Sequence, residues 1–207
     1  MAFGSAYLIR PPLAYSWLYS EAVFRKNPVE KKVYLTFDDG PNPEATCVAL
    51  SVLEKHGVKA TFFLLGKNVK KHPEIVALIQ AKGHQIGNHG MIHLNGWQTS
   101  TSAYIEDMKQ GKVETRSNLF RPAYGKLSLL QYRQIKQTEQ IVLWDIISGD
   151  FDPSINPDKV YDNVTKNVRN GSIIVMHDSP KALPNMQGSL NRIITELKKN
   201  GYAFGVL

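Results

Sequence analysis

The sequence predicts an α/β fold built on a parallel sheet. From residue 33 onward, short apolar segments typical of strands alternate with amphipathic segments typical of helices. Parallel strands need crossover connections, and helices between the strands supply them. The length of 207 residues and the hydrophobic content of 43% suit one domain that buries a core of its own. About seven predicted strands fit either a closed barrel or an open, doubly wound sheet.

The predicted strands are short segments rich in β-branched or aromatic residues. They are residues 33–37, 60–65, 84–88, 119–120, 141–147, 172–177 and 202–207. The first is followed by Asp38-Asp39-Gly40-Pro41, which is acidic where a phosphate-binding loop would be neutral or basic. This argues against a nucleotide-binding fold.

The predicted helices lie between these strands. They are residues 43–56, a helix from Pro73 to about Gly83, and residues 102–118, 158–169 and 189–200. Pro73 suits the first turn of its helix, and Gly57 stands where a glycine commonly ends one. In the helix over 102–118, we expect Tyr104, Ile105, Met108 and Val113 to face inward.

Residues 1–30 form an apolar and aromatic N-terminal segment, and residues 31–207 form the main domain. We expect Leu13–Phe24 to be a short helix packed on the domain, with shallow membrane contact through Trp17 and Tyr19 as the alternative. Arg10 and the Pro11-Pro12 pair interrupt the apolar run, so it matches neither a signal peptide nor a transmembrane helix. By sequence the protein is therefore cytoplasmic, with the cell envelope, near membrane or wall, left open.

The formal net charge of +7 permits a polyanionic partner but does not require one. Five Lys and Arg against two Glu lie in residues 1–32, so part of the excess is terminal, and we expect no nucleic-acid partner. The single cysteine, Cys47, excludes an internal disulfide framework and a cysteine-rich zinc site. Its place in an apolar helix indicates a packing role. The oligomeric state stays open.

Polar and reactive side chains stand where the predicted strands end. In a βα barrel, the carboxyl ends of the strands face one mouth, where active sites lie. Residues far apart in the sequence can therefore meet in one pocket. The residues concerned are Asp38 and Asp39, His89 and His93, Arg121, Asp150 and His177.

Two imidazoles and one carboxylate suit a divalent transition metal that keeps open positions for water. The spacing of His89 and His93 fits one helical face, but Gly90 makes a turn equally suitable. Zinc-bound water is a nucleophile near neutral pH, a nearby carboxylate can serve as base, and a separate imidazole as acid. The pattern thus predicts a metal-dependent hydrolase. A non-haem iron oxygenase also uses two His and one carboxylate, but the βα alternation and the missing His-x-Asp arrangement argue against it.

Four motifs resemble those of the NodB-homology polysaccharide deacetylases, carbohydrate esterase family four. They are Thr36-Phe37-Asp38-Asp39-Gly40, His89-Gly90-Met91-Ile92-His93, Arg121-Pro122-Ala123-Tyr124-Gly125 and Val175-Met176-His177. The resemblance covers residues 31–207. It implies a distorted, TIM-like (β/α) barrel of about seven strands. It also implies a substrate: N-acetylated sugars of a glycan such as chitin or peptidoglycan, from which acetyl groups are removed.

The resemblance also implies a role for each residue. Asp39, His89 and His93 would bind the divalent metal, most often zinc. Asp38 would be the general base, held by Arg121. The backbone N–H of Tyr124 would stabilise the oxyanion, and His177 would be the general acid.

Substrate contacts are predicted for Trp97, Tyr124 and Asp150. Trp97 follows the metal-binding segment and could stack on a sugar ring at the mouth. The alternative for Trp97 is a packed loop anchor.

A fifth motif of the family, which lies before the last of these four in the chain, departs most from the family pattern. The family has a Trp, an Asp three residues later and then Asp-Trp, where this chain has Trp144, Ile147 and Asp150-Phe151. We expect the Ile at 147 to lower the pKa of His177 and to reduce or alter activity, unless Asp145 or Asp150 compensates. An ester tolerates a weaker acid, so an O-acetyl esterase acting on xylan is one alternative. A catalytically impaired carbohydrate-binding relative is another, against which the filled base, metal and acid positions argue.

Overall fold

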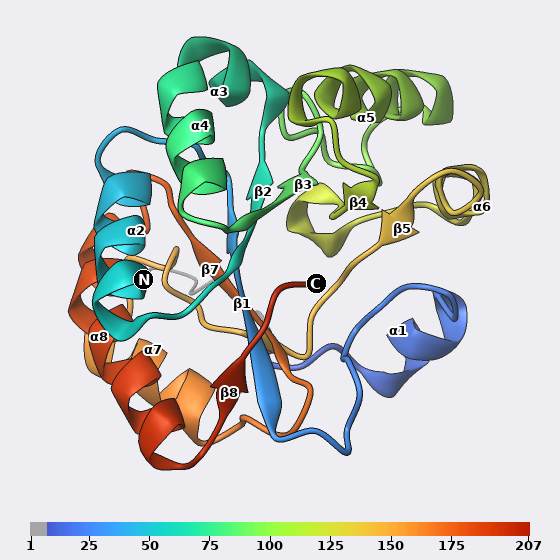
Figure 1. The fold of residues 1–207 in the computed structure, drawn as a ribbon. Coiled ribbons are helices and arrows are strands. Elements are labelled where there is room, and N and C mark those ends of the chain that lie inside the picture. Colours follow the sequence, from blue (N-terminus) through green and yellow to red (C-terminus); the bar gives the residue numbers. More distant parts are fainter. Residues whose placement is uncertain (1–7) are drawn as a thin grey trace.

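The computed structural model describes residues 8–207, so the first seven residues of the predicted N-terminal segment lie outside the described part. Seven strands form one curled sheet in the order β5-β4-β3-β2-β1-β7-β6, and β8 pairs with the start of β1 (Figure 1). All pairings between these strands are parallel. The predicted distorted (β/α) barrel is therefore confirmed. The strands are β1 (Lys32–Asp38), β2 (Thr61–Leu64), β3 (Gln85–Asn88), β4 (Leu119–Phe120), β5 (Gln140–Ile141), β6 (Ile146–Ile147), β7 (Ile173–His177) and β8 (Ala203–Phe204).

The helices follow the predicted alternation with two additions. Two short helices, α3 and α6, were not predicted, because six or seven residues are too few for a helical period to stand out. The last helix begins at Leu183 rather than at residue 189. As predicted, Gly57 ends the helix Ala45–His56, with a left-handed φ of 63°. The helices are α1 (Leu13–Leu18), α2 (Ala45–His56), α3 (Gly66–Lys71), α4 (Pro73–Ala81), α5 (Thr101–Thr115), α6 (Leu129–Ile135), α7 (Pro157–Thr165) and α8 (Leu183–Lys199), with a 3₁₀ turn, η1 (Ala123–Gly125).

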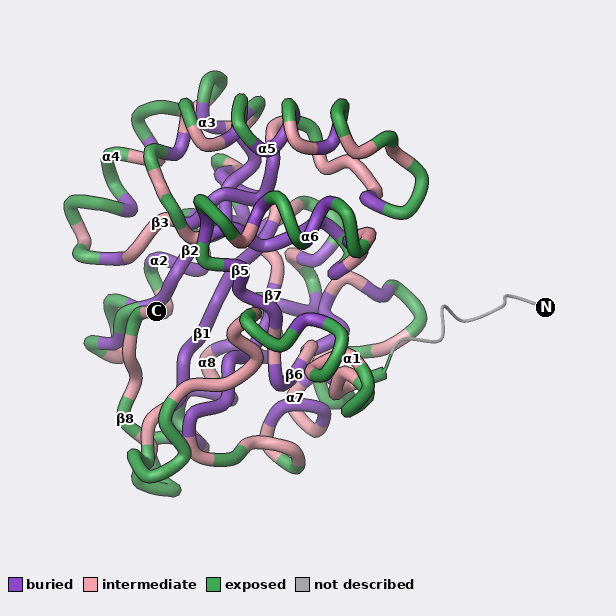
Figure 2. The backbone as a smooth tube through the Cα atoms, turned by 90° about the vertical axis from the view of Figure 1, so that its right-hand side faces the viewer, coloured by how far each residue is buried: buried purple, intermediate pink, exposed green. Residues whose placement is uncertain are grey.

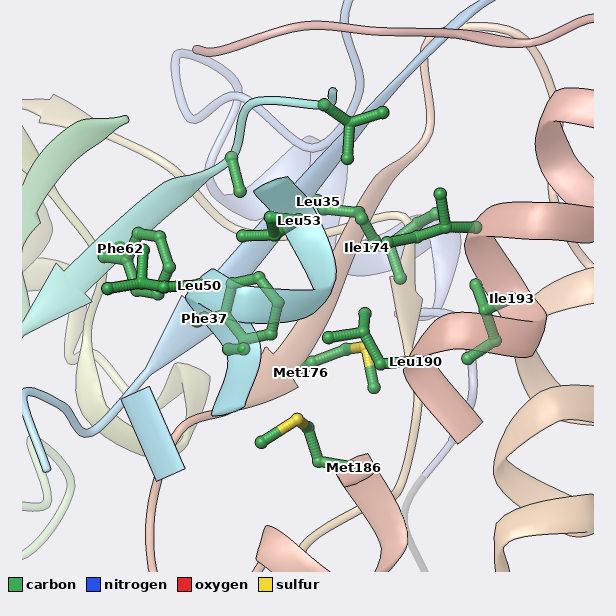
Figure 3. Close-up of a cluster of buried hydrophobic side chains, with 14 of the residues drawn as sticks. Leu35, Phe37, Leu50, Leu53, Phe62, Ile174, Met176, Met186, Leu190 and Ile193 are labelled. Atoms are coloured by element: carbon green, nitrogen blue, oxygen red, sulfur yellow. The ribbon is translucent and has the colours of Figure 1, made fainter. Parts of the chain in front are cut away.

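Alternate residues of the central strands face opposite sides of the sheet. Leu35 and Phe37 of β1 and Met176 of β7 point toward α2 and α8, where they pack against Leu50 and Leu190 (Figure 3). The strands between the helices are buried along most of their length (Figure 2). Because the apolar core occupies this outer face, the remaining strand residues are left to line the inside of the barrel.

The N-terminal segment fills the seam between β5 and β6, the two edges of the sheet. The Val23 N–H donates to the Ile141 carbonyl at 2.8 Å, and the Val23 carbonyl accepts from the Leu143 N–H at 2.9 Å. This extended pairing explains two corrections. The predicted helix over Leu13–Phe24 ends at Leu18, and the predicted strand over 141–147 is split into β5 and β6.

Two predicted side-chain placements are wrong, and the alternative of membrane contact loses one of its two residues. Tyr19 is buried, and its hydroxyl donates to the Leu127 carbonyl at 2.5 Å, so it cannot join the exposed Trp17 in membrane contact. Val113 and Cys47 are exposed. Both fall outside the inward stripes of their helices, which are Tyr104, Asp107, Met108, Gly111 and Thr115 in α5 and Thr46, Ala49, Leu50 and Leu53 in α2. Within residues 8–207, no helix has the length and apolar character needed to cross a bilayer.

Asp145 fastens the N-terminal segment to the base of the barrel. Its buried carboxylate accepts hydrogen bonds from Arg10 and Arg169, each at 2.5 Å, and from the Ser172 hydroxyl at 2.6 Å. Burial opposes the charge, but the hydrogen bonds from Arg169 and Ser172 and the charge of Arg10 lower the pKa of Asp145. The negative charge is thus the form that the fold stabilises.

We expect Asp145→Ala to lower the free energy of unfolding by about 2–3 kcal/mol, measured by urea denaturation. This is less than a fully buried pair would lose, because both arginines are partly exposed to solvent. Asp162→Ala, which removes the surface pair with Lys166, is the control and should cost about 0.5 kcal/mol or less. Equal losses in the two variants would contradict this anchoring role.

Candidate active site

Three predicted metal ligands lie together at the carboxyl ends of β1 and β3. Asp39 Oδ1 is 3.2 Å from His93 Nε2 and 3.7 Å from His89 Nε2, and the ligand atoms of all three residues lie within 4.8 Å of one another. His93 and Gly90 both have left-handed backbone, with φ of 67° and 84°. A turn rather than a helix therefore brings the two imidazoles onto the carboxylate.

The chemistry of these side chains fits a divalent metal such as zinc. His89 Nδ1 lies 2.8 Å from the Arg121 carbonyl, so the proton on Nδ1 points there and Nε2 is left free for a metal. Burial lowers the pKa of His89 to about 4, which keeps the ring neutral. Asp39 Oδ1 is buried without a hydrogen-bond partner among residues 8–207. Although burial opposes its charge, the neighbouring imidazoles, His93 first, hold the pKa of Asp39 below its usual range. A buried carboxylate oxygen that faces the Nε2 atoms of two imidazoles is a ready metal-binding set.

Two buried polar residues that sequence reasoning missed hold the histidine turn. Asn88 Oδ1 accepts from the Gly90 N–H at 2.9 Å, and the Asp107 carboxylate accepts from the N–H groups of Met91 and Ile92 at 3.0 Å. Asp107 stands in the inward stripe of α5. A carboxylate in an otherwise buried helical face was the signal that could have found it.

Asp38, the predicted base, is paired with Arg121 inside the barrel. Arg121 Nη1 donates to Asp38 Oδ1 at 2.7 Å and to the Thr36 hydroxyl at 2.7 Å, and Nη2 donates to the Leu143 carbonyl at 3.1 Å. The guanidinium is fully buried and lies 4.0 Å from the centre of the Phe63 ring. These contacts hold the Asp38 carboxylate in one orientation at the edge of the metal-binding set.

The turn after β1 is held by a buried carboxylate, Asp178, which the sequence analysis did not identify. Asp178 follows His177 directly and accepts from the Gly40 N–H at 3.1 Å and from the Thr46 hydroxyl at 2.5 Å. A Cβ at position 40 would lie 2.1 Å from Asp178 Oδ2, so this close approach requires glycine. Burial raises the pKa of Asp178 well above its usual value. The contact ties the end of β1 to the end of β7.

His177, the predicted acid, is paired with Asp150. Its Nδ1 lies 2.7 Å from Asp150 Oδ1, and its backbone N–H donates to Asp150 Oδ2 at 2.8 Å. Burial alone would favour the neutral ring, but the charge and hydrogen bond of Asp150 outweigh it and raise the pKa of His177 to about 9. The exception stated for Ile147 therefore applies, and the pKa of His177 is not lowered. Of the two compensating residues considered, Asp150 is the one in contact.

Asp150 is fully buried behind His177, so the prediction that it contacts substrate does not agree with its position. The side chain of Asn185 donates to the Asp150 carbonyl at 3.2 Å and further fixes this segment. Asp150 thus contacts His177 and is not among the residues that line the cleft.

The remaining predicted contacts line a cleft of about 850 Å³ that contains Asp38, the metal-binding set and His177. Trp97 is 57% exposed at its rim, with Nε1 donating to the Leu127 carbonyl at 3.3 Å, so it is both anchored and accessible. The Tyr124 ring packs edge-on against His93 with 4.5 Å between ring centres, and Tyr124 has a left-handed φ of 59°. The other apolar residues of this cleft include Pro122, Leu143, Trp144, Ile147, Phe151 and Val175.

Comparison with known proteins gives a consistent result. The sequence model of the family "Polysaccharide deacetylase" matches residues 25–140. A peptidoglycan-N-acetylglucosamine deacetylase of Bacillus cereus is 36% identical over 204 residues, which cover 93% of this chain and 73% of that protein. A crystal structure of a peptidoglycan N-acetylglucosamine deacetylase superposes with a TM-score of 0.88 and 33% identity over 95% of both chains. A pseudoenzyme of carbohydrate esterase family four from Bacillus anthracis superposes with a TM-score of 0.78 and 25% identity, over 90% of this chain and 67% of that one. The chain therefore belongs to the NodB-homology polysaccharide deacetylases of carbohydrate esterase family four.

Proposed function

We propose that this protein is a zinc-dependent hydrolase that removes N-acetyl groups from the sugars of a peptidoglycan-like glycan. The observation that carries the proposal is the meeting of three arrangements in one cleft. These are the Asp39, His89 and His93 set, the Asp38–Arg121 pair and the His177–Asp150 pair. Together they supply a metal site, a base and an acid, which amide hydrolysis needs.

Each residue then has a defined task. Bound by the three ligands, zinc would polarise the acetyl carbonyl and acidify a water. Asp38 takes the proton of the attacking water, while the hydrogen bond from Arg121 keeps its carboxylate oriented. The backbone N–H of Tyr124 donates to the developing oxyanion. His177, cationic through its contact with Asp150, protonates the departing nitrogen, so that acetate and a free amine are released.

The substrate class is supported by relatives and by charge. Two of the relatives named above are, by their names, peptidoglycan N-acetylglucosamine deacetylases. Lys126 and Lys181 lie in the cleft lining, packed over Trp97 and Phe151 respectively, and neither has a carboxylate within ion-pair distance in the described structure. Two cations in the lining of the cleft favour a glycan that carries carboxylates. Action on such a glycan would place the protein at the cell envelope.

The site gives less support to the two alternatives, an O-acetyl esterase and a catalytically impaired relative. The O-acetyl esterase was favoured because of a weakened acid, and the His177–Asp150 contact removes that reason. The catalytically impaired relative would lack one of the reacting groups, whereas all three arrangements are present here.

Acetate release tests the proposal and its metal dependence. We expect zinc-loaded protein to release acetate from peptidoglycan fragments faster than from N-acetylated chito-oligosaccharides, and faster than from acetylated xylan. A chelator should reduce the rate by about 10³-fold, because a Lewis acid supplies several kcal/mol of transition-state stabilisation, and added zinc should restore it. Full activity in chelator would overturn the metal site. Acetate release from xylan alone would overturn the amide substrate.

A further inference from the structure

One wall of the cleft is built by the N-terminal segment and not by the barrel. Together with the groups that react, the cleft is lined by five residues that precede β1. They are Leu8, Pro11, Pro12, Tyr15 and Phe24. α1 lies on the side of the sheet away from α2, α7 and α8 (Figure 1). The segment thus covers the barrel where the sheet edges leave it open.

This wall is fixed to the catalytic barrel by hydrogen bonds along its length. The Ile9 carbonyl accepts from the N–H of Ile147 in β6 at 2.9 Å, and Val23 is paired with the residues around β5. The Tyr19 hydroxyl and Trp97 Nε1 both donate to the Leu127 carbonyl. Trp97 lies at the rim of the cleft. The Leu127 carbonyl therefore holds both the N-terminal segment and this part of the rim.

Tyr15 is the aromatic residue that α1 presents to the cleft. Its ring is half-buried and packs edge-on against the buried Tyr19, with 5.4 Å between ring centres and 64° between ring planes. Trp17, two residues further on, points to solvent and is 81% exposed. An aromatic ring held by a second ring loses little conformational entropy when it packs against the C–H face of a sugar, and its hydroxyl can stay in water.

The size of the cleft agrees with such a role. Its 850 Å³ lies within the range of about 300–1,000 Å³ in which proteins enclose ligands of drug size. An acetyl group bound beside the three metal ligands needs only a small part of this space. The rest of the cleft, which both the N-terminal segment and Trp97 line, is large enough for further sugar units.

We propose that residues 8–24 form a glycan-binding subsite of the cleft and that Tyr15 is a specificity-determining residue that packs against a sugar ring beside the reacting one. The inference rests on the proposed deacetylase function for its kinetic consequences. Its binding consequence is independent of turnover.

The test compares Tyr15→Leu, Tyr15→Phe and the matched control Trp17→Ala in zinc-loaded protein. The substrates are a tetramer of N-acetylglucosamine, which has sugar units on either side of a reacting one, and 4-nitrophenyl acetate, which has none. Tyr15→Leu keeps an apolar contact with Tyr19 but removes the flat ring. We expect it to raise the KM for the tetramer about tenfold, equal to about 1.4 kcal/mol, with kcat and ester hydrolysis within about twofold. Tyr15→Phe and Trp17→Ala should match the parent protein on both substrates.

Tetramer affinity, measured by calorimetry, separates this inference from the proposed function. A parent protein that binds the tetramer without releasing acetate, and whose affinity falls about tenfold in Tyr15→Leu, would support the subsite while the deacetylase proposal fails. An unchanged KM and affinity in Tyr15→Leu would overturn the subsite. Equal losses on tetramer and ester would also overturn it, since they indicate a structural role, as would a parent protein that binds no tetramer.

Discussion

Asp38→Asn is expected to lower kcat by about 10³-fold while zinc remains bound, because a positioned general base contributes roughly 10²–10⁴-fold. The amide has nearly the shape of the carboxylate but cannot take a proton from water. Its oxygen can still accept the hydrogen bond that Arg121 Nη1 donates at 2.7 Å. The change therefore removes basicity and leaves the geometry in place. Acetate release at saturating substrate measures the loss.

Two further measurements make this test specific. Zinc stoichiometry should stay at the parent value in Asp38→Asn and fall in Asp39→Asn, since only Asp39 belongs to the ligand set. Removing the charge of Asp38 leaves the buried Arg121 without an anionic partner, so stability should fall, and circular dichroism must show folded protein at the assay temperature. A folded, zinc-loaded Asp38→Asn protein with parent activity would assign the base elsewhere.

The sequence predicts the meeting place of these groups because parallel strands end at one edge. Asp38 and His177 each end a buried apolar run, His89 directly follows β3, and the observed register sets Asp38 beside His177 in neighbouring strands. The prediction needed only the order of strands and helices, which the spacing of apolar residues indicates. Which of two adjacent aspartates meets the imidazoles depends on the backbone of the turn, where Asp39 has a φ of 82°. That choice came from family resemblance and not from periodicity.

Contacts that depend on a bend or on distant packing could not be predicted. Gly149 has a left-handed φ of 82° and turns the chain so that Asp150 comes level with His177 on the neighbouring strand. The family pattern pointed instead to position 147. Asp178 and the N-terminal wall are similar cases. Their partners lie more than a hundred residues away, and no local pattern marks them.

Asp150→Asn is expected to move the alkaline limb of the pH–rate profile to lower pH and to reduce kcat at pH 7 by about 10²-fold. His177 must carry its proton to act as acid, so activity is present below its pKa and is lost as pH rises through it. In the parent protein that loss is centred near the His177 pKa of about 9. Without the charge and hydrogen bond of Asp150, the pKa of His177 falls, because burial is then opposed only by the charges of Asp39 and Asp38. Initial rates of acetate release between pH 5 and pH 10 measure the limb.

Asp145→Asn is the matched control for this shift. Asp145 lies five positions before Asp150 in the chain and is buried, but its carboxylate contacts Arg10, Arg169 and Ser172 rather than His177. The variant should lose stability and keep the alkaline limb of the parent. A general loss of packing would lower activity at every pH alike, whereas loss of the Asp150 charge removes it first at high pH. An Asp150→Asn protein whose profile is lowered but not displaced would therefore show that Asp150 only supports the fold, and that another group keeps His177 protonated.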